Sequence, residues 1–483
     1  MTAMTSTRVP GEPGVVTAVD LGATSGRVIL GRIERGVLQM RHVARFANDP
    51  VHTRDGMHWN LLELYRQVVM GLAAAEREVP GEIVSVGIDS WGVDYGLFRG
   101  GRLLGVPYHY RDARNVAGVE AVHARVGAEE LFARNGLQHL AFNTVFQLAT
   151  EGEMLPFADR LLLIPDLLNF WLTGKAFAER SNASTTGLLG AETREWDLDL
   201  AKRLDIPEAI LPPLIDAGTS LGKLSLDVAE RVGRALNVVA VGSHDTASAV
   251  VAIPNPGRDF AFISCGTWGL VGLELDAPVL SEEARLANFT NEGGVDGRTR
   301  FLHNVMGLWL LSESLRHWEP AATDAQRSSL LGELLSEAAR VPATAPVFDV
   351  NDPAFVSAGD IPVRIRNWYR SRGERPPETR AEIVRCIIDS LAQAFADAVS
   401  EAARLANHEI SVIHIVGGGS QNVLLCQATA DRSGLRVVAG PTEATAMGNM
   451  LIQARVLGQV GPDLEDLRAV VARSTPLTEY LPR

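Results

Sequence analysis

The chain has 483 residues, which is too long for one ordinary domain and suits two large ones. Hydrophobic residues make up 46% and charged residues 21%, a balance that excludes disordered, collagen-like and coiled-coil proteins. The formal net charge of −13 argues against a nucleic-acid partner, which requires a basic surface. An acidic protein can still bind an anion locally, through backbone amides.

The cysteines and the N-terminus indicate the compartment. Cys265, Cys386 and Cys426 are too few for a disulfide framework and lack the spacing of a zinc site. Residues 1–14 are polar and contain no apolar signal core, and no uncharged stretch is typical of a membrane span. We therefore expect a cytoplasmic protein without a membrane partner.

The first elements predict a hairpin. Residues 15–19 form an apolar run, residues 20–27 contain two glycines, and residues 28–33 are again rich in β-branched side chains. The glycine turn therefore joins two strands rather than a strand and a helix. Apolar residues at helical spacing then predict a helix over 61–78, and a buried strand follows over 83–88.

A short strand over 238–241 ends at Ser243, and a second hairpin follows it. Residues 260–264 lead into a glycine turn at 265–269, and residues 270–275 continue as a strand. The hairpin of the N-terminus thus recurs in the second half. Residues 254–257 have the composition of a linker, so we expect domains over 1–253 and 254–483.

The C-terminal third alternates helices and strands. Thr379 and Glu382 form a capping box ahead of a long apolar-faced helix. A strand over 410–416 precedes Gly417-Gly418-Gly419, and a helix follows up to Ser433. Because strands alternate with helices in both halves, the sequence predicts an α/β architecture.

The scarcity of lysine removes one class of nucleotide site. The three lysines are Lys175, Lys202 and Lys223, and none stands in the G-x-x-x-x-G-K-[ST] pattern of a P-loop. The segment from Gly417 also departs from the dinucleotide-binding pattern at its last position. A phosphate site in this chain would have to use backbone amides.

The two glycine turns are the candidates for such a site. Backbone amides of two turns can bind polyphosphate without lysine, and Thr24, Ser25 and Thr267 would add hydroxyl donors. Two ordinary surface hairpins are the alternative. Asp20, at the mouth of the first turn, is a candidate Mg²⁺ ligand, acting through water because Mg²⁺ keeps much of its hydration shell.

Two further patterns suggest a hydroxyl-bearing substrate. Asp245 follows a buried strand and is a candidate general base, with capping of the next helix as the alternative. Trp91 and Asp94, with the polar run 109–112, suit a sugar, because an aromatic face and paired hydrogen bonds recognise such rings. Core packing is the alternative for Trp91.

Several blocks, taken in order, resemble those of the FGGY carbohydrate kinases. These blocks are residues 20–27, 87–94, 243–248, 266–267, 290–294, 304–309 and 415–422. The resemblance extends from about residue 15 to residue 457. It implies two actin-like ATPase (ribonuclease H-like) α/β domains with a nucleotide and sugar cleft between them.

The resemblance also implies roles for individual residues. ATP would be bound by Ala23, Thr24, Ser25, Gly26, Arg27, Gly266, Thr267, Ser312 and Gly418. A ketose would be bound by Gly92, His244, Asp245, Thr246 and Asn304, with Asp245 accepting the proton of the 1-hydroxyl. Ser312 stands where we would expect glutamine, so this one ATP contact departs from the family's pattern.

The resemblance further implies an enzyme that uses ATP and Mg²⁺ to phosphorylate L-rhamnulose at its 1-hydroxyl, in L-rhamnose catabolism. A kinase for another ketose, such as L-fuculose or L-xylulose, is the first alternative. A non-enzymatic nucleotide-binding module, like actin, is the second. Family members with a structural cysteine pair have no counterpart here, so we expect no disulfide.

Overall fold

The computed structural model describes residues 14–254, 257–355, 357 and 359–483. It divides into two compact units. Unit 1 comprises Met1–Pro256, Glu274–Phe301 and Ala444–Thr475, and unit 2 comprises Gly257–Leu273, Leu302–Glu443 and Pro476–Arg483. The chain therefore contributes a C-terminal segment to the unit in which it begins. The N-terminal residues 1–13 and residues 255–256 of the predicted linker lie outside the described residues.

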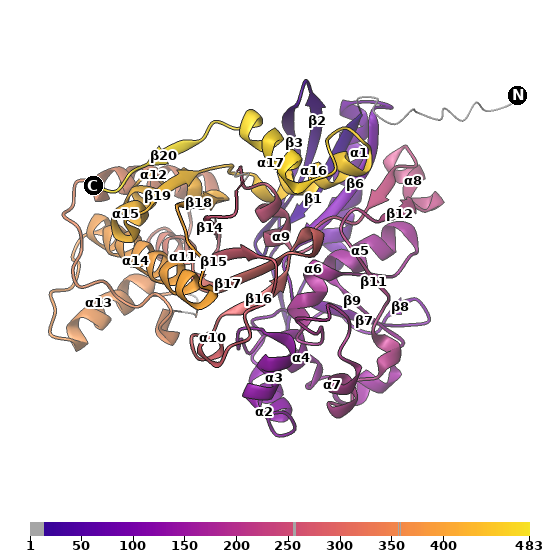
Figure 1. Cartoon of the computed structure of the whole chain (residues 1–483), viewed down its shortest axis with the longest axis horizontal. Helices are drawn as coiled ribbons and strands as arrows, with labels where there is room; N and C mark the ends of the chain where they lie inside the picture. Colours follow the sequence, from indigo (N-terminus) through magenta and orange to yellow (C-terminus); the bar gives the residue numbers. More distant parts are fainter. Residues whose placement is uncertain (1–13, 255–256, 356, 358) are drawn as a thin grey trace, which may run out of the picture. The chain divides into compact units, whose positions relative to one another are not determined.

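Unit 1 is built on a six-stranded sheet (Figure 1). Its strands in order are β12 (Ser220–Lys223), β13 (Asn237–Val239), β6 (Ile83–Ser90), β1 (Val15–Leu21), β2 (Ser25–Glu34) and β3 (Val37–Ala47). Strands β1, β6 and β13 are parallel to one another, and β1 and β2 form the predicted antiparallel hairpin, which is confirmed. Because β1, β6 and β13 are parallel, their carboxyl ends lie at one edge of the sheet.

Helices cover both faces of this sheet. Helix α1 (Leu61–Glu78) has the predicted bounds and buries Leu64, Val68 and Leu72 in the apolar cluster that includes Val19 and Val28 of the sheet. Helices α9 (Asp245–Val251) and α16 (Ala444–Val456) pack against each other, and α16 packs on β1 and β6. The alternate side chains of β1 thus face different helices, which is the expected consequence of its period of two.

Smaller elements complete unit 1. The helices are α2 (Asn115–His123), α3 (Ala128–Asn135), α4 (Thr144–Leu148), α5 (Ile164–Thr173), α6 (Arg180–Ala183), α7 (Leu198–Arg203), α8 (Leu226–Val232), α10 (Glu282–Leu286) and α17 (Leu464–Ser474). The strands are β4 (Val51–Thr53), β5 (Gly56–His58), β7 (Tyr95–Arg99), β8 (Arg102–Leu103), β9 (Arg160–Leu163), β10 (Ala178–Glu179), β11 (Leu214–Ile215) and β16 (Thr290–Gly293). Residues 113–223 contain more helices than strands.

The sheet of unit 2 repeats the strand order of unit 1. This seven-stranded sheet begins with β16, and the six strands that follow are β17 (Thr299–Met306), β15 (Trp268–Leu275), β14 (Phe260–Cys265), β18 (Val412–Val416), β19 (Arg436–Ala439) and β20 (Thr478–Tyr480). Strands β14 and β15 form the second predicted hairpin, and β14 lies parallel to β18, which lies parallel to β19. The two glycine turns therefore occupy equivalent places in two related sheets.

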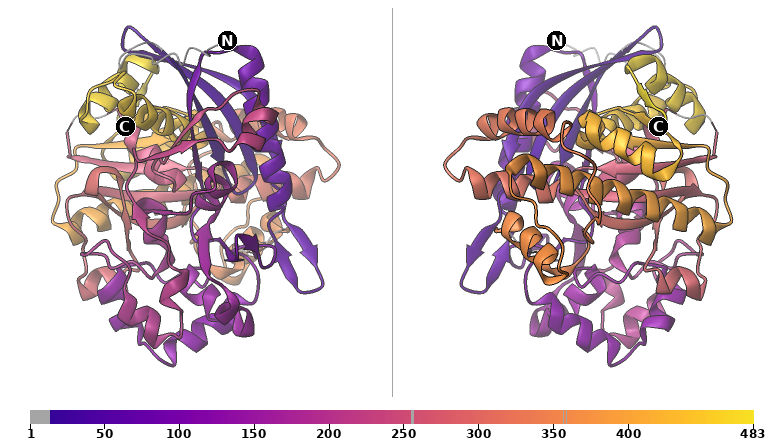
Figure 2. Two further views of the ribbon diagram at one scale, coloured as in Figure 1. Left: turned by 90° about the vertical axis from the view of Figure 1, so that its right-hand side faces the viewer. Right: turned by 90° about the vertical axis from the view of Figure 1, so that its left-hand side faces the viewer.

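The helices of unit 2 follow the C-terminal sequence pattern. They are α11 (Trp309–Trp318), α12 (Asp324–Ala338), α13 (Ile361–Ser371), α14 (Arg380–Ala406) and α15 (Val423–Ser433). Helix α14, the long orange helix in the right-hand view of Figure 2, begins with the predicted capping box of Thr379 and Glu382, which is confirmed. It packs on α12 and α15.

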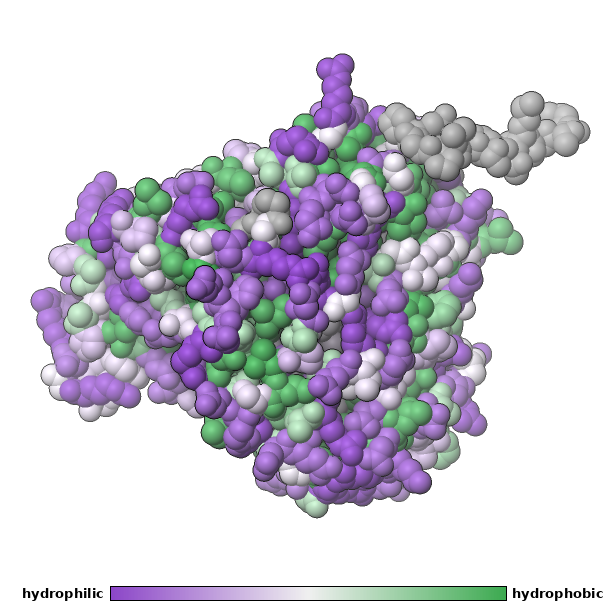
Figure 3. All heavy atoms as spheres, viewed as in Figure 1, coloured by the Kyte–Doolittle hydropathy of each residue, from purple (hydrophilic) through white to green (hydrophobic). Residues whose placement is uncertain are grey.

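Hydrophilic residues cover most of the face seen in Figure 3. Across the part of the chain that the structure describes, no helix combines the length and the apolar character needed to cross a membrane. Cys265, Cys386 and Cys426 are buried as free thiols.

Candidate active site

Three aspartates meet at the carboxyl edge of the unit 1 sheet. Asp20 of β1 is paired in register with Asp89 of the parallel strand β6. The next residue of β6, Ser90, donates from its backbone N to the oxygen of Ser243 at 2.9 Å and bridges to His244. Asp245 follows directly as the first residue of α9. In open α/β sheets this edge, beyond the carboxyl ends of parallel strands, is where ligands bind.

Asp89 is the member of this group that sequence reasoning missed. Burial raises the pKa of its carboxyl well above the ordinary value, and the charges of Asp20 and Asp245 raise it further. Its Oδ2 accepts a hydrogen bond from Asn449, whereas its Oδ1 is buried with no hydrogen-bond partner among the described residues. The sequence around Asp89 gave no signal for this, because its partner Asp20 belongs to a neighbouring strand.

The carboxylates of Asp20 and Asp89 form a donor set that suits Mg²⁺. Mg²⁺ prefers hard oxygen ligands, and an orphaned buried carboxylate oxygen beside a second carboxylate is relieved by a divalent cation. One cation is already close, since Nε of Arg27 lies 3.5 Å from Oδ2 of Asp20. Asp20 and Asp89 would be two ligands only. Within residues 14–254, 257–355, 357 and 359–483, no three His, Cys, Asp or Glu side chains are placed so that they could hold one metal ion together.

The first glycine turn is held open by Asn48. The backbone N of Asn48 donates to the oxygen of Thr24 at 3.0 Å, and its Nδ2 donates to the oxygen of Gly22 at 2.9 Å. Thr24 is exposed, whereas Gly26 is buried, and a Cβ at Gly26 would lie 2.2 Å from the ring of Phe46. Gly26 is therefore required by packing, and the exposed part of the turn is the part that a ligand can reach.

Asp245 is accessible and lies next to His244. Its side chain is 31% exposed, and its Oδ1 accepts a hydrogen bond from the hydroxyl of Thr246 at 3.1 Å. Nε2 of His244 lies 3.4 Å from the same oxygen. His244 is buried and has an extended conformation just before α9. Asp245 is therefore the first residue of the helix. A partly exposed carboxylate with few partners can accept a proton from a hydroxyl.

Trp91 and Asp94 are joined to each other. Nε1 of Trp91 donates to Oδ2 of Asp94 at 3.0 Å, and Nε1 of Trp59 donates to the same oxygen at 2.6 Å. Gln147 donates to Oδ1 at 2.9 Å. Burial raises the pKa of Asp94 to about 7, even though these donors lower it. The predicted contact of Asp94 with a sugar would require one of these donors to move away.

Aromatic rings surround this carboxylate. Trp59 lies 4.0 Å from Trp91 and 4.1 Å from His109 between ring centroids. Burial, with the nearby charge of Arg111, lowers the pKa of His109 to about 3, so the ring is neutral near pH 7. Gly92 packs tightly against Thr185: a Cβ at position 92 would lie 2.9 Å from the hydroxyl of Thr185, so the packing leaves no room for a side chain there.

The second glycine turn is braced by the start of α11. The backbone N of Leu308 donates to the oxygen of Gly266 at 2.9 Å, and the N of Trp309 donates to the oxygen of Thr267 at 3.2 Å. A Cβ at Gly266 would meet nothing within 4 Å. Ser312, on the first turn of α11, is half-buried.

The three glycines after β18 differ in how closely they are packed. A Cβ at Gly419 would lie 2.4 Å from Sγ of Cys265, and Gly417 has a positive φ of 80° and lies against the backbone of the same residue. Gly418 is exposed, and the nearest atoms to a Cβ there would be 4.0 Å away. The fold therefore explains Gly417 and Gly419, whereas the missing side chain of Gly418 leaves open space for a ligand.

The predicted site residues fall into the two units as follows. Unit 1 holds Asp20, Ala23, Thr24, Ser25, Gly26, Arg27, Trp91, Gly92, Asp94, His244, Asp245 and Thr246. Unit 2 holds Gly266, Thr267, Asn304, Ser312 and Gly418. Within unit 1 the structure brings Asp20 and Asp245 to one edge of a sheet, and within unit 2 it brings Gly266 and Gly418 to either side of Cys265.

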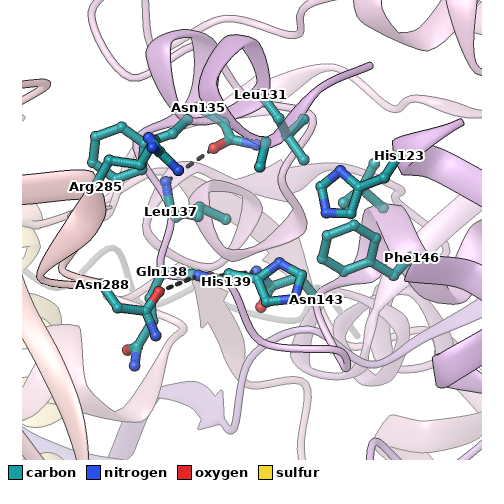
Figure 4. Close-up of a pocket in the computed structure, with 13 residues that line it drawn as sticks. His123, Leu131, Asn135, Leu137, Gln138, His139, Asn143, Phe146, Arg285 and Asn288 are labelled. Atoms are coloured by element: carbon teal, nitrogen blue, oxygen red, sulfur yellow. Dashed lines mark hydrogen bonds between the residues drawn. The ribbon is translucent and has the colours of Figure 1, made fainter. Parts of the chain in front are cut away.

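One small cavity of unit 1 contains none of these residues. It has a volume of about 60 Å³ and is lined by residues that include His123, Asn135, His139 and Arg285 (Figure 4). The rings of His123 and His139 lie 5.4 Å apart between centroids. That volume holds only a few water molecules, so this cavity does not offer room for a ketose.

Known proteins resemble this chain over nearly its whole length. The model for the FGGY family of carbohydrate kinases, N-terminal domain, matches residues 15–252, and the model for the C-terminal domain matches residues 261–457. The chain is 39% identical to a rhamnulokinase of Bacteroides thetaiotaomicron over 473 residues, which are 96% of this chain and 95% of the relative. It is 41% identical to a rhamnulokinase of Pectobacterium carotovorum over 477 residues, 97% of this chain and 93% of the relative.

Solved structures show the same fold at much lower identity. A gluconate kinase of Lactobacillus acidophilus matches with a TM-score of 0.76 and 17% identity, covering 98% of this chain and 94% of that one. A glycerol kinase of Plasmodium falciparum matches with a TM-score of 0.73 and 13% identity, covering 96% of this chain and 94% of that one. The expected two-domain α/β kinase fold is confirmed.

Proposed function

The chain belongs to the FGGY family of carbohydrate kinases, and from this premise we propose that it transfers the γ-phosphoryl group of ATP to the 1-hydroxyl of L-rhamnulose. The products are L-rhamnulose 1-phosphate and ADP, and the reaction belongs to L-rhamnose catabolism. The relatives at 39% and 41% identity, which cover nearly the whole chain, support this substrate. We place the reaction in the cytoplasm, where ATP is available. In sequence we propose domains over residues 1–253 and 254–483, although residues 274–301 and 444–475 of the second belong to the compact unit of the first.

Asp245 is the general base of the proposed reaction. It lies at the carboxyl edge of the sheet with a side chain that is 31% exposed, and this single observation carries the mechanism. Its carboxylate accepts the proton of the 1-hydroxyl while the oxygen attacks the γ-phosphorus. His244, Thr246, Gly92 and Asn304 orient the ketose, and Trp91, held by Asp94, covers its apolar face.

Backbone amides bind the phosphates. The exposed part of the turn from Ala23 to Arg27 and the turn at Gly266 and Thr267 supply donors, and Gly418 leaves space for the adenosine. Asp20 and Asp89 would hold Mg²⁺, which would neutralise charge on the phosphates. Ser312 faces the nucleotide with a shorter side chain than glutamine would have.

The substrate is tested with a panel of ketoses and coupled detection of ADP. We expect kcat/KM to be highest for L-rhamnulose. A higher kcat/KM for L-fuculose or L-xylulose would reassign the enzyme to another ketose. ATP turnover that is independent of any sugar, and rises instead with protein concentration or added polymer, would identify a nucleotide-operated binding module.

A further inference from the structure

Arg300 is a buried cation directly behind the proposed sugar site of unit 1. It lies at the start of β17, and its side chain is fully buried. Its Nε donates to the oxygen of Gly293 at 3.0 Å, and one terminal nitrogen lies 3.0 Å from Oε2 of Glu292. The other terminal nitrogen lies 3.0 Å from Nδ1 of His244. Burying a charged side chain costs desolvation free energy. A fully buried arginine therefore needs specific partners, and its contacts indicate what it does.

The contact with His244 fixes where the imidazole carries its proton. A guanidinium has only donors, so the ring nitrogen that it touches must be the acceptor. Nδ1 is then unprotonated, and the single proton of the neutral ring lies on Nε2. Oε2 of Glu292 also lies 3.2 Å from Nδ1, and it lies 3.0 Å from the other terminal nitrogen of Arg300, so the guanidinium is a partner of this carboxylate as well. Protonation of Nδ1 would set two N–H groups against each other.

Nε2 faces Asp245, the proposed general base. It lies 3.4 Å from Oδ1 of Asp245, whereas Nδ1 faces the interior. The charged groups that face His244 are Asp245 on α9, Glu292 on β16 and Arg300 on β17, and Glu179 acts on Arg300 from β10. Without Arg300, the imidazole would lie between two carboxylates, and an Nδ1–H could donate to Glu292. In that tautomer Nε2 has no proton to direct at Asp245.

We propose that Arg300 is a positioning residue that holds His244 as the neutral Nε2–H tautomer, so that this N–H points at Asp245 and at a hydroxyl of the bound sugar. Glu292 is the counterion that allows Arg300 to remain buried. The catalytic consequence rests on the proposed function, but the tautomer is a property of the unliganded protein. The two claims can therefore fail separately.

The tautomer is measured on the full-length protein labelled with ¹⁵N at its histidines. A long-range ¹H–¹⁵N correlation spectrum distinguishes an Nε2–H ring, an Nδ1–H ring and an imidazolium. The chain has 11 histidines, so the signals of His244 are assigned by their loss in His244→Gln. We expect the Nε2–H pattern near pH 7.5. An Nδ1–H ring or an imidazolium in the wild-type protein would overturn the proposal, whatever the variants do.

Variants of Arg300 test the cause. In Arg300→Met we expect His244 to change to the Nδ1–H or doubly protonated pattern and kcat to fall at least tenfold with an unchanged KM for ATP. Arg300→Lys keeps a donor and should restore the Nε2–H pattern in part. The matched control is Arg468→Met, which removes another buried arginine of unit 1, paired with Glu274 rather than His244. It should lower stability and leave the His244 signals unchanged.

The outcomes separate cleanly. An unchanged His244 pattern in folded Arg300→Met overturns the role of Arg300. If Arg300→Met does not fold, Arg300→Gln takes its place, because its neutral side chain is too short to make the contacts of the guanidinium. A changed His244 pattern in that variant supports the role of Arg300, and an unchanged pattern overturns it. A protein that shows the expected tautomer but no activity on L-rhamnulose would overturn the proposed function and leave this inference standing.

Discussion

Asn449 of α16 donates a hydrogen bond from Nδ2 to Oδ2 of Asp89 at 2.5 Å, although 360 positions separate the two residues in the sequence. The bond is part of a buried ladder in unit 1. Nε2 of Gln453 donates to Oδ1 of Asn449 at 2.7 Å, and Oε1 of Gln453 accepts from the hydroxyl of Ser85 at 2.6 Å. Helix α16 thus supplies hydrogen bonds that the side chains of the buried strand β6 could not make within that strand.

Asn449→Ala is expected to lower the free energy of unfolding by about 2–4 kcal/mol, because it removes a donor from a fully buried carboxylate and an acceptor from Gln453. The measurement is the shift of the urea midpoint at pH 7.5. Asn367→Ala is the control, since Asn367 is exposed on α13 and its loss should change stability by less than about 0.5 kcal/mol. Equal shifts of the urea midpoint in both variants would contradict a stabilising role for the hydrogen bonds of Asn449.

Asp94 should make stability depend on pH. Its pKa is raised to about 7 in the folded protein from an ordinary value of 3.8, so the folded state binds the proton more tightly. The contribution of this proton to the free energy of unfolding is complete below pH 4. It is lost as the pH rises to 7, at a slope of up to about 1.4 kcal/mol per pH unit. Urea titrations from pH 4 to 8 should show a flatter dependence in Asp94→Asn. Parallel curves for the two proteins would rule this out.

Asp245→Asn removes the proposed base and keeps the shape of the side chain. We expect kcat to fall by about 10²–10⁴ with an unchanged circular dichroism spectrum, which is the range that a general base contributes. Asp227→Asn is the control, because Asp227 lies exposed in the first turn of α8 as Asp245 lies in the first turn of α9. Activity of Asp245→Asn within about tenfold of the wild type would refute this role.

Gly418 and Gly419 form a matched pair. Gly418→Ala points a methyl group into open space, so stability should hold while KM for ATP rises about fivefold or more, the effect of 1 kcal/mol of overpacking on the ligand. Gly419→Ala forces a methyl onto Cys265 and should instead lower the melting temperature. Calorimetry and ATP kinetics on both variants separate the effects. If Gly418→Ala binds ATP normally, the proposed adenosine site lies elsewhere.

Ser312→Gln tests the one departure from the family's pattern. The longer amide would add a hydrogen bond to the nucleotide and lower KM for ATP by about 2–10-fold, which corresponds to 0.5–1.5 kcal/mol. KM for the ketose should stay the same. Ser312→Ala is the companion variant and should change KM for ATP little, because we assign the serine hydroxyl no strong contact. A large loss in Ser312→Ala would show that the serine already serves the nucleotide.

The local features of the fold were predictable from the sequence. The bounds of α1, the capping box at Thr379 and the hairpins on either side of Gly22 and Gly266 depend on residues a few positions apart. Turn chemistry and hydrophobic periodicity act over the same short range, so they appear directly in the sequence. The glycine-bearing turns after β1, β14 and β18 were predictable for the same reason.

The sequence by itself determined that this is an α/β protein with two glycine turns and an acidic candidate base, because those properties are written in neighbouring residues. Only the tertiary structure decided that Asp89 stands beside Asp20, that Asn449 reaches it, and that Arg300 touches Nδ1 of His244. These contacts join segments far apart in the chain, and their strength comes from burial. Strand register and the exclusion of water exist only once the sheet and its helices have assembled.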